Sequence, residues 1–187
     1  MRGAALKGAR SIAITGLAAA TLTAGKFVLS AVPNVEIVTL LSAVYGFVLG
    51  LPGILAVYVF VTCETLIYGF GTWVISYYIH WPSVAFAFFF LSKFIRPSRL
   101  IPTALAVVMT IWFGVLTSLT DVGLFSGFWD DFGTRFAIYY ARGAVFYVIQ
   151  TVCNAIVFPL LFKPLCELSG KALKIRVGKS EDPPHMR

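Results

Sequence analysis

Charged residues are scarce in this sequence: aspartate, glutamate, lysine and arginine together make up 12% of its 187 residues. A soluble domain carries about 25%, so this chain lacks the polar side chains that would cover a water-facing surface. The shortage excludes an ordinary soluble enzyme, an intrinsically disordered protein and a typical nucleic-acid-binding domain. Hydrophobic residues make up 59%, and the mean hydropathy is +0.87. We therefore expect an all-α integral membrane protein.

Histidine and cysteine are also rare. The two histidines, His80 and His185, form no pair at metal-ligand spacing, and no catalytic set or nucleotide-binding loop is present. Cys63 and Cys153 lie inside apolar runs and Cys166 just past one, which predicts packing residues and no disulfide framework. We expect no enzyme activity, no metal and no cofactor. If the chain moves a solute uphill, a partner must supply the energy.

The apolar runs predict six membrane helices in one compact bundle. A span needs ~20 apolar residues, and Pro33-Asn34 and Gly50-Leu51-Pro52-Gly53 separate runs that are long enough. The start of the fourth run is open, because its helix could begin earlier and contain Pro82. The six-helix domain is residues 1–175, followed by a flexible basic tail at 176–187. The expected spans are about 11–32, 35–51, 52–70, 81–95, 101–120 and 136–162.

The net charge of +7 indicates how the chain is oriented in the membrane. With six spans and a cytoplasmic N-terminus, 12 of the 15 lysines and arginines lie on the inner side. Cytoplasmic loops carry such an excess. We therefore expect a multi-pass protein of the cytoplasmic membrane with both termini inside. A nucleic-acid partner is not needed to explain the charge.

Four ionisable residues fall inside or at the ends of the expected spans: Lys26, Glu36, Glu64 and Arg142. Such residues are costly in a membrane and suggest a functional site. The expected topology places all four in the outer half of the bilayer. They either form structural ion pairs between helices or line a polar cavity that opens to the outside.

Two expected helices each carry polar and small residues at a spacing of three to four, which places them on one face. Such groups can hydrogen-bond within a bundle, but two such faces beneath outer aromatic residues also suit a pocket for a small, partly planar polar molecule. The two faces are Thr110, Gly114, Thr117, Ser118 and Asp121, and Tyr139, Gly143, Tyr147, Gln150 and Asn154. Trp73, Tyr77, Tyr78 and Trp81 mark the expected boundary of the membrane.

The first span carries small residues four apart: Gly16, Ala20 and Ala24. This spacing lets another helix approach closely. Internal packing and docking of an external partner are both compatible with it.

Residues 16–82 resemble the substrate-binding S components of energy-coupling factor (ECF) transporters. The resemblance lies in the small-residue first span, in Pro33-Asn34-Val35-Glu36 and in the stretch Glu64 to Trp73, Glu-Thr-Leu-Ile-Tyr-Gly-Phe-Gly-Thr-Trp. It implies a subunit that captures a vitamin or related micronutrient from outside and delivers it inward. Its partners would be a membrane coupling (T) subunit and two cytoplasmic ABC ATPases.

The resemblance implies that Gly16, Ala20 and Ala24 dock the coupling subunit, and that the ligand lies in the outer half. The signatures of the riboflavin, thiamine and biotin members are missing, so the cargo is open. The alternatives are a membrane scaffold or assembly protein without a ligand, a self-contained secondary carrier and a membrane-embedded enzyme. Together with the polar faces, the resemblance gives this candidate substrate-binding set: Asn34, Glu36, Glu64, Tyr68, Trp73, Tyr77, Thr117, Tyr139, Arg142, Tyr147, Gln150 and Asn154.

Overall fold

A computed structural model describes residues 8–32, 35–175 and 177. These residues form α-helices joined by short turns, together with one π-helical turn, and contain no strand. The elements are α1 (Gly8–Leu29), α2 (Val38–Leu49), α3 (Leu51–Tyr68), α4 (Trp73–Leu91), α5 (Leu100–Ser118), the π-helical turn η1 (Leu119–Leu124) and α6 (Phe132–Leu173).

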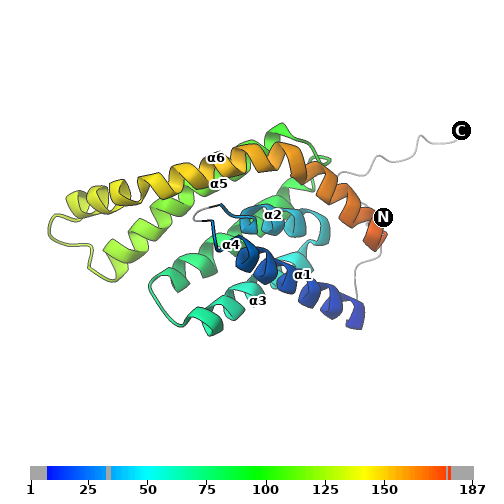
Figure 1. The fold of residues 1–187 in the computed structure, drawn as a ribbon, viewed down its shortest axis with the longest axis horizontal. Helices are drawn as coiled ribbons and strands as arrows, with labels where there is room; N and C mark the ends of the chain where they lie inside the picture. Colours follow the sequence, from blue (N-terminus) through cyan, green and yellow to red (C-terminus); the bar gives the residue numbers. More distant parts are fainter. Residues whose placement is uncertain (1–7, 33–34, 176, 178–187) are drawn as a thin grey trace, which may run out of the picture.

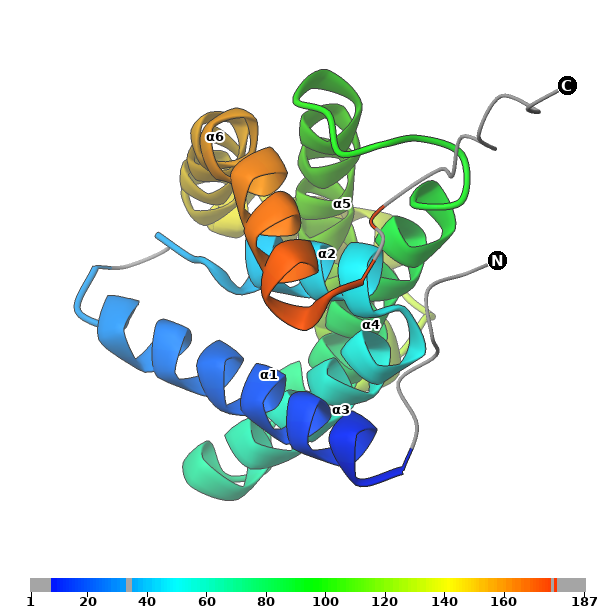
Figure 2. The ribbon, with the colours of Figure 1, turned by 90° about the vertical axis from the view of Figure 1, so that its right-hand side faces the viewer.

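The helices pack as three pairs. α2 and α4 lie in the middle, with α1 and α3 against one side and the hairpin of α5 and α6 against the other (Figure 2). The α5–α6 hairpin is long and extends past the other helices at one end (Figure 1). At the opposite end, the guanidinium of Arg10 donates a hydrogen bond of 2.8 Å to the carbonyl of Leu173. The beginning of α1 and the end of α6 therefore lie together.

Glycine and proline set the two tightest turns. Gly50 stands between α2 and α3 with a φ of 67°, and Pro52 lies in the first turn of α3, where its missing N–H costs nothing. Gly69 ends α3 with a φ of 81°, which is a conformation that glycine adopts readily. The turn predicted at 50–53 is thus confirmed.

α2 is the centre of the core. Nine of its twelve residues are buried. One apolar cluster joins α2 to α4, α5 and α6 around Phe88, Phe158 and Phe162. A second joins α2 to α1, α3 and α4 around Leu22 and Phe60. The bundle is therefore built around this short helix.

The outside of the bundle is largely apolar. Large hydrophobic side chains are exposed on α1, α3, α4, α5 and α6. Water-facing helices carry polar residues there, whereas a bilayer accepts apolar ones. Among the described residues, five helical segments are long and apolar enough to cross a membrane, and α2 is a shorter apolar helix. The chain is an all-helical protein whose helices fit a multi-pass membrane bundle.

Several helix bounds differ from the expected spans. α2 covers less than 35–51, and its 12 residues reach ~18 Å at 1.5 Å per residue, well short of the ~30 Å hydrocarbon core. α4 begins at Trp73, before the expected 81, and contains Pro82. α6 runs without a break through Pro159 and Pro164 to Leu173. Apart from Val177, the expected tail at 176–187 lies outside the described residues.

Candidate functional site

Lys26 and Glu64 form an ion pair between α1 and α3. The Glu64 side chain is 1% exposed, and that of Lys26 is 30% exposed. The Lys26 ammonium also lies 5.3 Å from the ring centroid of Tyr68 and 5.0 Å from that of Tyr77, which are distances for cation–π attraction. The ammonium is therefore satisfied by protein groups, as the ion-pair interpretation of these two residues requires.

Glu36 has a different role and does not pair with Arg142. One of its carboxylate oxygens accepts a bond of 2.8 Å from the backbone N–H of Thr39, in the first turn of α2. The other accepts 2.9 Å and 2.5 Å bonds from the Asn154 amide and the Thr39 hydroxyl. The amide nitrogen of Asn154 also donates to the Thr110 hydroxyl at 3.0 Å. This network joins the beginning of α2 to α5 and α6.

Five buried side-chain polar atoms have no hydrogen-bond partner among the described residues. Two are the hydroxyls of Ser42 and Ser98, and the other three are Asn154 Oδ1 on α6 and His80 Nδ1 and Trp81 Nε1 on α4. Buried polar atoms are rarely left unpaired, because each costs about 1–3 kcal/mol. Such atoms point to a partner outside the chain, either ordered water or a small molecule.

The aromatic rings around these atoms converge on Phe113 of α5. Its ring centroid lies 4.6 Å from that of His80, 5.6 Å from Trp81 and 6.0 Å from Tyr77. Phe113 and Thr110 are three residues apart, so they share one face of α5. Thr110, which accepts a hydrogen bond from the Asn154 amide, and Phe113, which contacts the aromatic rings, therefore lie about one turn apart on α5. The unpaired amide oxygen of Asn154 thus lies beside the same part of α5 as the aromatic cluster.

Trp73 and Tyr77 belong to this cluster, with ring centroids 4.9 Å apart. Tyr68 is exposed, beside the Lys26 ammonium. Asn34 lies outside the described residues. The structure thus brings Glu36, Asn154 and Tyr77 near the centre of the bundle, with the Lys26–Glu64 pair adjoining Tyr77.

The remaining candidate residues lie further along the α5–α6 hairpin. Thr117 and Tyr147 join their hydroxyls at 3.2 Å, two helical turns beyond Thr110 and Asn154, or roughly 10 Å at 1.5 Å per residue. The Tyr139 hydroxyl donates to the Asp121 carboxylate at 2.6 Å. These side chains thus hydrogen-bond with one another and take no part in the network that joins Glu36, Thr110 and Asn154.

Arg142 and Gln150 also lie on α6. Arg142 is exposed and has no ion-pair partner among the described residues. It precedes Asn154 by 12 residues, or roughly 18 Å along the helix. Gln150 is half-buried, one turn before Asn154. The eleven candidates among the described residues therefore do not form one cluster.

The small-residue stripe on α1 faces outward. Gly16, Ala20 and Ala24 are all exposed, and no neighbouring atom lies within 4 Å of a Cβ built on Gly16. The opposite face packs inward through Ala18 and Ala19, which meet α3. The stripe is not used for packing within the bundle.

The candidate residues chosen from the sequence do not include His80, Trp81 and Phe113, which the structure adds as candidates. The sequence contained a signal, since residues 73, 77, 80 and 81 follow the three-to-four spacing of one helix face. The sequence predicts Trp81 at the membrane boundary and provides no metal-ligand partner for His80, whereas the structure buries both side chains in the bundle.

No protein-family model, no curated protein and no solved structure matches the chain.

Proposed function

We propose that this chain is the substrate-capturing membrane subunit of an ECF-type transporter. It binds a vitamin-like micronutrient and delivers it when docked on a coupling subunit driven by two ABC ATPases. The observation that carries the proposal is the set of unpaired buried polar atoms, Asn154 Oδ1, His80 Nδ1 and Trp81 Nε1, beside aromatic rings in an apolar bundle. Ligand pockets combine apolar and aromatic walls with a few such polar groups.

The geometry also limits the chemistry of the cargo. Lys26 is neutralised by Glu64, and Arg142 is far from the unpaired atoms along α6. The Trp81 indole can only donate a hydrogen bond, and the Asn154 oxygen can only accept one. The part of the cargo held here is therefore an uncharged planar group with both a donor and an acceptor.

The proposed topology has six helices with both ends of the helical domain at the cytoplasmic face. The contact between Arg10 and the carbonyl of Leu173 supports an even number of crossings, because it holds the beginning of α1 beside the end of α6. In this topology α2 is enclosed by the longer helices, which accounts for its burial and its short length.

Replacing His80 with phenylalanine tests the binding site. The ring and its packing on Phe113 are retained, but Nδ1 is removed. Stability should be unchanged or slightly higher, because an unpaired polar atom is lost. The amount of small molecule retained by the purified protein, measured by mass spectrometry after extraction, should fall about two- to tenfold, the equivalent of one hydrogen bond of ~0.5–1.4 kcal/mol.

Ser76 provides a control on the same helix, since its hydroxyl already pairs with that of Thr120 at 3.0 Å. Ser76→Ala should lower stability and leave retention unchanged. If the wild-type protein retains no small molecule from its native membrane, or if H80F retains as much as wild type, the binding site is wrongly assigned.

Leucine at both Ala20 and Ala24 tests the docking face. Bulk on this outward stripe should prevent close approach of another helix, so pull-down of the ATPases and the second membrane protein from native membranes should be lost while ligand retention persists. Ala137 and Ala141 are a matched control, because they are also exposed and four residues apart, on α6. Equal recovery of partners by both double variants would contradict the docking assignment.

A membrane scaffold without a ligand is the second candidate. It is favoured by the side-chain pairs that fill part of the polar interior, Lys26 with Glu64 and Thr117 with Tyr147. This candidate predicts that ordered water alone occupies the unpaired atoms. It also predicts that H80F and wild type behave alike in every binding measurement.

A further inference from the structure

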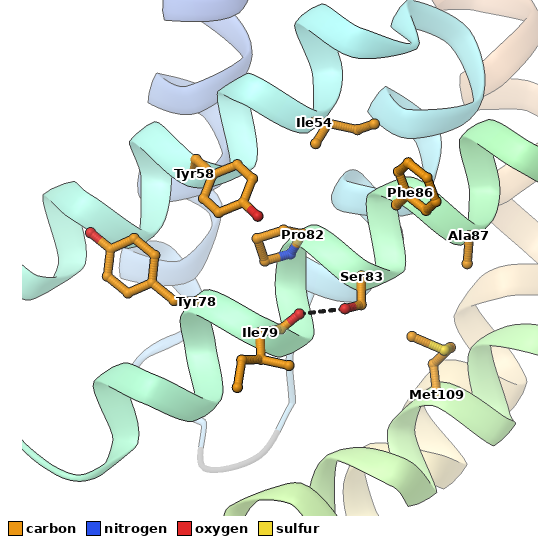
Figure 3. Close-up of a pocket in the computed structure, with 9 residues that line it drawn as sticks. All are labelled: Ile54, Tyr58, Tyr78, Ile79, Pro82, Ser83, Phe86, Ala87 and Met109. Carbon is orange, nitrogen blue, oxygen red and sulfur yellow. Dashed lines mark hydrogen bonds between the residues drawn. The ribbon is translucent and has the colours of Figure 1, made fainter.

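A groove of about 580 Å³ runs along the outside of the bundle between α3, α4 and α5. Figure 3 shows its floor at Pro82 and Ser83 of α4, with Tyr58 of α3 and Met109 of α5 on either side. The Ser83 hydroxyl donates to the carbonyl of Ile79 at 2.6 Å. Its polar side chain is thus occupied within the helix, and the groove presents mainly apolar surface.

This apolar surface is open. Tyr58, Ile79 and Phe86 line the groove and are exposed, and no described residue covers them. In a bilayer such a surface contacts lipid chains. The groove is therefore the right kind of surface for an acyl chain, and the surrounding charges decide which lipid it suits.

A basic segment follows the part of α4 that lines the groove. Lys93, Arg96 and Arg99 lie in the segment that joins α4 to α5, are exposed, and have no acidic residue between them in the sequence. The Lys93 ammonium lies 4.3 Å from the ring centroid of Phe90, and the Phe90 ring lies 5.6 Å from that of Phe86. A row of aromatic rings thus connects the cation to the groove.

The length of this path matches one leaflet. From Tyr78 to Lys93 the chain rises roughly 22 Å at 1.5 Å per residue. Half of a bilayer of ~40–45 Å, headgroups included, is about the same. With Lys93 at headgroup level, the other end of the groove at Tyr78 lies near the bilayer midplane. In this placement Tyr78 does not mark the membrane boundary, whereas the sequence alone predicts that it does.

We propose that this groove binds one anionic phospholipid, with an acyl chain along α4 and its phosphate at Lys93 and Arg99. Basic pockets between membrane helices hold anionic headgroups in this way. The positive-inside expectation places this segment at the cytoplasmic face, where anionic lipids are found. The proposal requires only that the bundle lies in a bilayer and is independent of the proposed transport function.

The test is native mass spectrometry of the purified full chain, titrated with phosphatidylglycerol or with phosphatidylcholine of the same acyl chains. One phosphatidylglycerol should bind at least about tenfold more tightly than phosphatidylcholine. Lys93→Gln with Arg99→Gln should remove this preference. Ala87→Phe, which fills the groove, should weaken binding of both lipids.

Matched variants on α6 control for charge and bulk. Lys163→Gln with Lys171→Gln removes two exposed basic groups, and Ala155→Phe adds the same ring at an exposed alanine. Both should bind lipid as wild type does. Equal affinity of wild type for the two lipids, or equal losses in the groove variants and the controls, would overturn the proposal.

A labelling experiment uses the wild-type chain, so its result does not depend on whether a variant folds. Phosphatidylglycerol with a photoactivatable acyl chain should label peptides from residues 78–93 or around Met109. Label confined to other segments would overturn the assignment. So would recovery of a lipid-free dimer that Ala87→Phe dissociates, because the groove would then belong to a second copy of the chain.

Discussion

Removing either member of the Lys26–Glu64 pair should have unequal effects. Glu64 is almost completely buried, whereas Lys26 is 30% exposed and lies near the rings of Tyr68 and Tyr77. In Lys26→Met the Glu64 carboxylate loses its counter-ion inside the bundle. In Glu64→Gln the ammonium retains two aromatic faces and an amide oxygen that can accept its hydrogen bond.

The expected magnitudes follow from these surroundings. Leaving a buried charge without its partner costs about 3–5 kcal/mol, which applies to Lys26→Met. Glu64→Gln keeps a hydrogen bond and cation–π contacts worth ~0.5–2 kcal/mol, so its loss should be about 1–2 kcal/mol. The double variant Lys26→Met with Glu64→Leu replaces the pair with apolar groups of similar size and should lie within ~1 kcal/mol of wild type.

Unfolding of the detergent-solubilised protein, followed by tryptophan emission during denaturant titration, measures these differences. The exposed pair Lys163–Glu167, at 3.9 Å on α6, provides the control, since Lys163→Met should cost no more than about 0.5 kcal/mol. If Lys26→Met is no more destabilising than Glu64→Gln, the buried carboxylate does not depend on this ammonium. The structural ion pair is then wrong, and Lys26 again becomes a candidate for binding an anionic ligand.

Two further changes test the packing and the central network. Gly46→Ala should destabilise the bundle by at least about 1–3 kcal/mol, because its new methyl group would clash with the backbone carbonyl of Ala85. Gly133→Ala on α6 meets open space and should cause no loss in the same unfolding assay. Thr39→Val should cost about 1–3 kcal/mol by removing a hydroxyl donor from the Glu36 carboxylate; wild-type stability in this variant would mean that this hydrogen bond contributes nothing.

Amino-acid composition and the positions of helix-breaking residues predicted the helical architecture well. An apolar run longer than ~20 residues has few stable alternatives to a helix in a membrane, and Gly50 and Pro52 stand where the sequence places a turn. The start of the fourth helix is left open by local rules and is decided by packing. The earlier of the two starts is the one found, because the turns from Trp73 onward pack against α3 and α5 and hold Pro82 in the interior of α4.

The candidate site was harder to predict. The spacing of residues along the sequence places them on one face of a helix, but it does not show which other helix packs against that face. Lys26, Glu36, Glu64 and Arg142 could pair in several ways. The choice depends on how α1, α3 and α6 are rotated and how far each extends. α6 is one continuous helix to Leu173. Asn154 on this helix donates a hydrogen bond to Glu36, and Arg142 therefore lies about three turns away, out along the hairpin of α5 and α6.

The pairing of these charges changes which part of the interior is available for a ligand. On the α1–α3 side, Glu64 and the aromatic rings already satisfy Lys26, so a ligand there would have to break a buried ion pair. On the α4–α5–α6 side, the unpaired atoms of His80, Trp81 and Asn154 cost free energy until something binds them. A ligand that supplies their hydrogen bonds removes this cost as it binds. Of the two sides, the aromatic cluster around Phe113 is thus the energetically favourable place for a ligand, and the charged pair stabilises the helices beside it.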